Sequence, residues 1–216
     1  MNSRSKKYVL SIAVVFIVLS VLFAENSPLI AAKRPPEIDP QEFRDNMRKL
    51  WEDHVNLTRF FIISTVSNLP DQNETAQRMI QNQNEIGDAI KPFYGDAAGD
   101  QLAELLREHA LISATMLQAA RKADAPAFED AVEKWYSNAD ELAELLFELN
   151  PENWPLRKTR PIMKVYLDLT LEQALARWNG DFEKDMESYD KVHTHALEIA
   201  DMLSEGIINR FWERFR

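Results

Sequence analysis

The chain has 216 residues and no cysteine, and its 25 basic and 35 acidic residues give a net charge of −10. This acidic balance argues against a nucleic-acid-binding surface, which needs clustered basic charge. The lack of cysteine removes disulfides, thiolate catalysis and thiolate–metal ligation. The chain has only five glycines and neither a G-x-G-x-x-G nor a G-x4-G-K-[ST] motif, so no phosphate-binding loop is expected.

The N terminus has the features of an export signal. Residues 8–24 form an uninterrupted run of 17 apolar or small residues, preceded by three basic residues and followed by an acidic one. A run of this length can span a membrane with its positive flank in the cytoplasm. The alternative is a signal peptide cleaved after Ala24, although Leu22 stands where a small residue is preferred. Residues 1–24 therefore predict a single-pass protein of the cell membrane with its C-terminal domain outside the cytoplasm, or a secreted domain after cleavage.

A linker and a helical domain follow. Residues 25–39 contain three prolines and no periodicity, which is typical of a linker. Asp39, Pro40 and Glu42 form a helix-start signal, so the domain is expected to cover residues 40–216. Turn-forming residues divide it into six predicted helices, over residues 40–68, 72–91, 97–122, 126–149, 157–179 and 182–212. The expected fold class is an all-α bundle.

The six helical stretches repeat in pairs. The first, third and fifth stretches share one pattern: an apolar residue, a polar or aromatic residue four positions later, and then an apolar residue followed by Ser or Thr. The polar or aromatic residues at the centre of this pattern are His54, His109 and Tyr166. The second, fourth and sixth share a second pattern, centred on Asn82, Asn138 and His195. Equivalent residues are 55 and 57 positions apart in the first pattern, and 56 and 57 in the second. Two patterns with one period predict three tandem helical hairpins.

The repeated polar residues are predicted to point inward. Positions three before, four after and seven after a residue share its helix face, and these positions are mostly apolar around the central residues. The face of Tyr166 is more polar, because Thr159 and Gln173 lie on it. A threefold pseudo-axis would create two rings, one formed by His54, His109 and Tyr166 and the other by Asn82, Asn138 and His195.

These inward residues allow two interpretations. A buried polar group without a partner costs roughly 1–3 kcal/mol, so each must be satisfied by another side chain, the backbone, water or a ligand. They could be packed core residues that fix the helix register. They could instead form a ligand site, with Arg59 as a candidate anion-binding group or ion-pair partner. The candidate ligand-binding residues are His54, Arg59, Asn82, His109, Asn138, Tyr166 and His195.

A transition metal is one candidate ligand. Two or three imidazoles with an oxygen ligand suit zinc, copper or non-haem iron. The candidate metal ligands are His54, His109, His195 and Glu198. The chain contains neither E-x-x-H nor H-E-x-x-H, so the common di-iron and zinc-protease motifs are absent.

Several motifs resemble a family of small, uncharacterised bacterial helical proteins over most of residues 45–210. They are Leu50-Trp51-x2-His54-x3-Thr58-Arg59, Pro92-Phe93-Tyr94-Gly95, Trp135-Tyr136-x-Asn138-Ala139-Asp140-Glu141 and Ala200-Asp201-x3-Glu205-Gly206-Ile207. The resemblance implies an all-helical fold and no established activity. Some family members are labelled acetylglutamate kinase or glycosyltransferase, but this chain has no nucleotide loop and no α/β alternation. Family members often have His at the position of Tyr166.

The functional expectation is a non-enzymatic binding or scaffold domain outside the cytoplasm. Residues 8–24 would hold it in the membrane, and its partner would be a protein or a small ligand rather than nucleic acid. The alternative is a metal-dependent enzyme or redox module that uses His54, His109 and His195.

Overall fold

The computed structural model describes residues 37–215, which belong to one compact unit. Its helices in chain order are α2 (Pro40–Val66), α3 (Gln72–Tyr94), α4 (Asp96–Arg121), α5 (Ala125–Leu149), α6 (Leu156–Trp178) and α7 (Phe182–Arg210), followed by the short 3-10 helix η1 (Trp212–Arg214). The all-α class and the six predicted helices are therefore confirmed. The expected membrane anchor at residues 8–24 lies outside the described residues. Within residues 37–215, no helix combines the length and the apolar character needed to cross a bilayer.

The helix ends follow local capping chemistry. The Asp39 side chain accepts hydrogen bonds from the backbone N–H groups of Gln41 (2.7 Å) and Glu42 (2.8 Å), which fixes the start of α2 as expected. The largest boundary difference is at α3, which continues through Pro92 and ends three residues later than predicted. A proline in the last turn removes only one helical hydrogen bond, so the helix continues until Gly95 (φ 86°) ends it.

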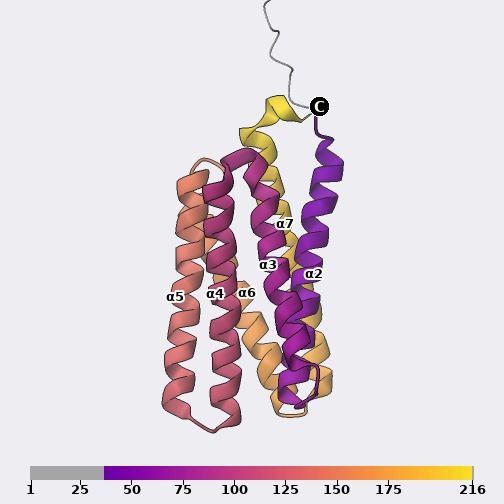
Figure 1. The fold of residues 1–216 in the computed structure, drawn as a ribbon, viewed down its shortest axis with the longest axis vertical. Helices are drawn as coiled ribbons and strands as arrows, with labels where there is room; N and C mark the ends of the chain where they lie inside the picture. Colours follow the sequence, from indigo (N-terminus) through magenta and orange to yellow (C-terminus); the bar gives the residue numbers. More distant parts are fainter. Residues whose placement is uncertain (1–36, 216) are drawn as a thin grey trace, which may run out of the picture. The chain divides into compact units, whose positions relative to one another are not determined.

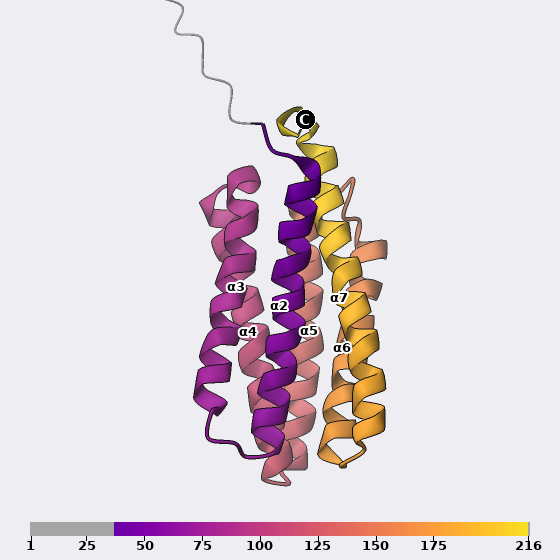
Figure 2. The ribbon, with the colours of Figure 1, turned by 90° about the vertical axis from the view of Figure 1, so that its right-hand side faces the viewer.

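The six helices form a closed ring of three hairpins, α2–α3, α4–α5 and α6–α7 (Figures 1 and 2). Each helix packs along its neighbours in the chain, and α7 packs along α2 to close the ring. Helix α2 also contacts α4 and α6 across the ring. The first helices of the hairpins therefore face the centre of the bundle.

The core fills the interior of this ring. Its largest fully buried side chains include Trp135, Trp154 and Ile199. Helices α3 and α4 are in close backbone contact at Gly87 and Gly99, where a Cβ atom on Gly87 would lie 2.5 Å from the Gly99 carbonyl oxygen. Only glycine permits this backbone contact.

The predicted repeat is visible in contacts at one end of the bundle. Tyr94, Asn150 and Gly206 are spaced by 56 residues and lie near the corresponding ends of α3, α5 and α7. The Asn150 side-chain amide donates hydrogen bonds to the Tyr94 hydroxyl (3.1 Å) and to the Gly206 carbonyl oxygen (2.8 Å). Tyr94 and Asn150 are equivalent in the repeat and Gly206 precedes the third equivalent position by one residue, so the same ends of the three hairpins meet, as an approximate threefold arrangement requires.

The two ends of the described chain are also joined. The Ile38 N–H donates a hydrogen bond to the Arg214 carbonyl oxygen (2.9 Å), and the Phe215 ring packs on Phe43 and Phe93. The unit therefore has its own core and its ends are paired with each other. We expect residues 37–216 to fold without the preceding segment.

Candidate functional site

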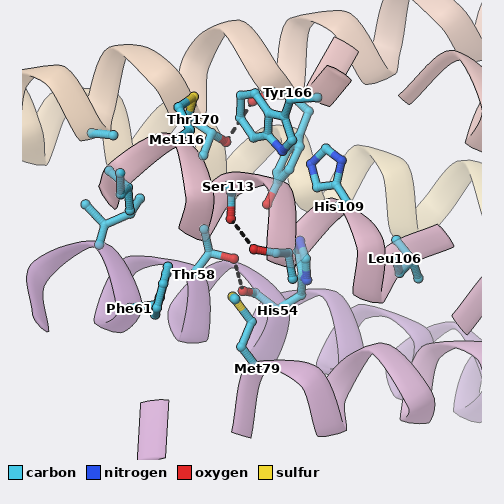
Figure 3. Close-up of a pocket in the computed structure, with 15 residues that line it drawn as sticks. His54, Thr58, Phe61, Met79, Leu106, His109, Ser113, Met116, Tyr166 and Thr170 are labelled. Carbon is cyan, nitrogen blue, oxygen red and sulfur yellow. Dashed lines mark hydrogen bonds between the residues drawn. The ribbon is translucent and has the colours of Figure 1, made fainter. Parts of the chain in front are cut away.

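A cavity of about 30 Å³ lies at the centre of the bundle, enclosed by residues of α2 to α6. Figure 3 shows the side chains that line it. Three layers of its wall each consist of equivalent residues of the three hairpins: His54, His109 and Tyr166, then Thr58, Ser113 and Thr170, then Ile62, Leu117 and Ala174. The cavity therefore lies on the approximate threefold axis.

The first predicted ring is brought together around this cavity. His54, His109 and Tyr166 extend into the same space from α2, α4 and α6, and all three are buried (Figure 3). The ring centroids of His54 and Tyr166 are 5.9 Å apart. The imidazole of His109 stacks on Trp135, with centroids 4.9 Å apart. Two imidazoles and one phenol thus form the polar side of an otherwise largely apolar cavity.

The polar residues of the second pattern do not form a ring. Instead, each hydrogen-bonds to a backbone carbonyl on the first helix of its own hairpin. The pairs are Asn82 with Leu50 (3.1 Å), Asn138 with Leu105 (3.1 Å) and His195 with Ile162 (2.8 Å). These carbonyls belong to equivalent positions of the repeat, so the three bonds are one contact repeated three times. Their role is to hold the two helices of each hairpin in register.

Both cavity histidines are held through Nδ1. His109 Nδ1 lies 2.9 Å from Asn138 Oδ1, and the bond from Asn138 Nδ2 to Leu105 fixes the orientation of this amide. Nδ1 of His109 is therefore the N–H donor, and Nε2 carries the lone pair. His54 Nδ1 lies 3.2 Å from Gln83 Nε2. Nε2 of each ring has no hydrogen-bond partner among the described residues.

The cavity is uncharged at neutral pH. Burial lowers the pKa of His54 to about 4. Burial also lowers the pKa of His109 to about 4, against the opposing hydrogen bond of Asn138. The same desolvation raises the pKa of Tyr166. Both imidazoles and the phenol are consequently neutral.

Two buried donors at the cavity lack partners. Within residues 37–215, neither the Tyr166 hydroxyl nor Nε1 of Trp135 makes a hydrogen bond. An unpaired buried donor costs roughly 1–3 kcal/mol, so such groups normally contact water or a ligand. The cavity exceeds the roughly 10–15 Å³ needed for a water molecule. It can therefore accept a guest that satisfies these groups.

The predicted metal ligand set is not assembled. His195 and Glu198 pair with each other (Nδ1 to Oε2, 2.8 Å), whereas His54 and His109 line the cavity. Across residues 37–215, no three His, Asp or Glu side chains are arranged to share an ion. The periodicity identified the inward faces of the helices, but it could not show which faces meet.

Arg59 is also placed away from the cavity. Its guanidinium forms two hydrogen bonds with the buried carboxylate of Asp185, at 2.7 and 3.1 Å. The carboxylate lies 3.5 Å from Arg177 as well. Arg59 therefore joins α2 to α7, and the ion-pair alternative describes it correctly.

Three hydroxyl-bearing residues that line the cavity are not among the site residues predicted from the sequence. The hydroxyls of Thr58, Ser113 and Thr170 line the cavity and donate to carbonyls about one turn earlier in their own helices. The signal was present, because Ser or Thr ends the first repeat pattern in all three copies. A hydroxyl within a helix most often bonds its own backbone, so this repeated Ser or Thr does not by itself predict a site.

Comparison of the chain with protein-family models, curated proteins and solved structures finds no match. The family resemblance stays a prediction, and the central cavity is the structural feature that bears on function.

Proposed function

We propose that the bundle is a ligand-binding domain that holds a small uncharged molecule in the central cavity. The observation that carries this proposal is the buried Tyr166 hydroxyl, which has no hydrogen-bond partner among residues 37–215 and lies in a cavity built from equivalent positions of three hairpins. Tyr166 would donate a hydrogen bond to the ligand. His109 would accept one through the lone pair on Nε2.

The chemistry of the wall favours an uncharged ligand. None of the 15 residues that line the cavity is Lys, Arg, Asp or Glu. A charged group placed there would lose its hydration without gaining a counter-ion. A hydroxyl or carbonyl group can be satisfied by neutral imidazole and phenol groups.

The cavity can adapt to a ligand larger than water. Met79 and Met116 line it, and a methionine side chain has three rotatable bonds and no branch. A ligand of the size of benzene requires these side chains to rotate, because a cavity of about 30 Å³ is smaller than the roughly 150 Å³ that holds benzene. The apolar residues Phe61 and Leu106 would then cover the carbon skeleton of the ligand.

A binding role fits the geometry better than a catalytic one. The Ser113 hydroxyl donates to the Ala110 carbonyl (2.7 Å) and not to an imidazole, so the wall has no activated serine. Among the described residues, the Tyr166 hydroxyl and Trp135 Nε1 are the unpaired buried groups whose side chains line the cavity, and a ligand there would satisfy them.

Phenol and benzene test the proposal, since they differ only in a hydroxyl group. Residues 37–216 would be titrated with each by calorimetry, and phenol is expected to bind more tightly. Tyr166→Phe should weaken phenol binding about tenfold, the equivalent of one hydrogen bond, and leave benzene binding unchanged. Tyr136→Phe is the matched control, because the Tyr136 hydroxyl donates to Asp168 outside the cavity.

Two results would contradict a ligand site. One is equal binding of phenol and benzene to the wild-type domain. The other is an undiminished preference for phenol in Tyr166→Phe. Either would mean that the Tyr166 hydroxyl has no role in binding.

We also propose that the domain acts outside the cytoplasm, held in the membrane by residues 8–24. The support is the long apolar run with its basic flank. A reporter enzyme that is active only outside the cytoplasm, fused after residue 216, should be active in cells. The N-terminal residue of the protein recovered from membranes would then distinguish an intact anchor from a cleaved signal peptide.

A further inference from the structure

An apolar groove of about 400 Å³ lies where the α4–α5 turn faces the C-terminal half of α6. Its large side chains are Phe128, Leu171, Leu175 and Trp178. Asp124 is its only charged lining residue among the described part of the chain, and its carboxylate accepts a hydrogen bond from the Ala127 N–H (3.1 Å) as the cap of α5. The groove therefore offers a ligand apolar contacts and no basic group.

The groove and the central cavity share part of their walls. Met116, Leu117 and Ala174 line both. The floor of the groove is thus the side of the cavity nearest this end of the bundle. Met116 has the most adaptable of these side chains, so its rotation is the smallest movement that would join the two spaces.

We infer that the groove and the cavity form one binding site for an elongated, uncharged amphiphile. The apolar tail would lie in the groove, and a terminal hydroxyl or carbonyl would reach His109 and Tyr166. This inference rests on the proposed function, since it requires a ligand in the cavity. It adds the class of that ligand and the path by which it enters.

Three observations support this ligand class. The cavity of about 30 Å³ is too small for most metabolites, whereas a groove of about 400 Å³ lies within the usual range of small-molecule sites. Leu175 and Trp178 are 46% and 39% exposed, so a tail in the groove would remove apolar surface from water. No Lys or Arg of residues 37–215 lines either space, so a carboxylate or phosphate head group would find no partner there at either end.

Alkylphenols test whether an apolar tail on the ligand increases its affinity. 4-Hexylphenol is expected to bind residues 37–216 more tightly than phenol, by about fourfold for each methylene that the groove covers. The charged 4-hexylbenzoate should bind at least tenfold more weakly than 4-hexylphenol. Tyr166→Phe should remove the preference for 4-hexylphenol over hexylbenzene.

A charge introduced into the groove tests whether the apolar tail of the ligand binds there. Leu175→Glu should weaken 4-hexylphenol at least tenfold and leave phenol binding unchanged. Val165→Glu is the matched control, because Val165 lies on the same helix and is similarly exposed, at 43%, but does not line the groove. This control should leave the affinity for both probes unchanged.

The outcomes separate the inference from the proposed function. If phenol binding depends on Tyr166 but 4-hexylphenol binds no more tightly than phenol, the cavity is a ligand site and the inference is wrong. An effect of Val165→Glu as large as that of Leu175→Glu would overturn the location, and tight binding of 4-hexylbenzoate would overturn the uncharged ligand class. If phenol binding does not depend on Tyr166, the proposed function itself fails.

Discussion

Acidification from pH 7 to pH 5 should destabilise the fold through the two cavity histidines. Their pKa is about 4 in the folded protein, compared with about 6.5 for an exposed histidine. As the pH falls below 6.5, the unfolded chain binds protons that the folded chain does not, so stability present above pH 6.5 is lost progressively down to about pH 4. At pH 5 the loss is about 2 kcal/mol for each histidine, or about 4 kcal/mol for both.

A loss of this size is a large fraction of the roughly 5–15 kcal/mol that stabilises a typical domain. It would be measured by urea denaturation followed by circular dichroism at pH 7, 6 and 5. His109→Gln should reduce the loss between pH 7 and pH 5 by about 2 kcal/mol relative to the wild type, since only one buried imidazole remains. The carboxylates are the same in the variant and the wild type, so their contribution to the loss of stability cancels when the two proteins are compared.

His193→Gln provides the control for removal of an imidazole that does not line the cavity. The reasoning fails if His109→Gln and the wild type lose the same stability between pH 7 and pH 5. That result would mean that the imidazole of His109 takes up a proton without disturbing the fold.

Three further substitutions test the packing, each by urea denaturation at pH 7. Asn138→Leu should cost about 2 kcal/mol, because one buried and one partly buried hydrogen bond are lost; a fully stable variant would show that neither bond matters. Gly87→Ala should cost about 1–3 kcal/mol, since the new Cβ would lie 2.5 Å from the Gly99 carbonyl oxygen, and an unchanged midpoint would contradict the close contact. Asp185→Asn should cost about 3 kcal/mol by leaving the Arg59 guanidinium without its counter-charge, whereas a neutral effect would indicate that the ion pair only balances its desolvation.

The fold could be predicted because its signals are local. Asp39 with Pro40 marks the start of α2, and the turn residues separate the helices within three positions of their observed ends. The repeat then identified the three hairpins. The extension of α3 beyond Pro92 was missed, because a proline near a helix end is compatible with either a stop or one more turn.

The site could be predicted only in part. Helical periodicity correctly predicted that His54, His109 and Tyr166 point toward the interior, and the threefold repeat correctly predicted that they lie together. It grouped Asn82 and Asn138 in the same way, although each bonds within its own hairpin. Periodicity defines which face of a helix is buried, but the partner of that face depends on the packing of the whole ring.

The groove could not be predicted because it depends on the spacing of helices. Its walls combine the end of α4, the start of α5 and the end of α6, and apolar residues there read as ordinary core positions. Exposed Leu175 and Trp178 mark it only once the neighbouring helices are in place.

The hydrogen bond between Ile38 and Arg214 holds the two ends of the described chain side by side, so we expect that a different helix can begin the chain without a change of architecture. A short peptide joining residue 215 to residue 37 would turn the ring of helices into a covalent circle. New termini could then be opened at the exposed turn at Lys122 and Ala123 or at Gly180, where no buried backbone is cut. Such circular permutants would begin with α5 or with α7 while keeping the same interior.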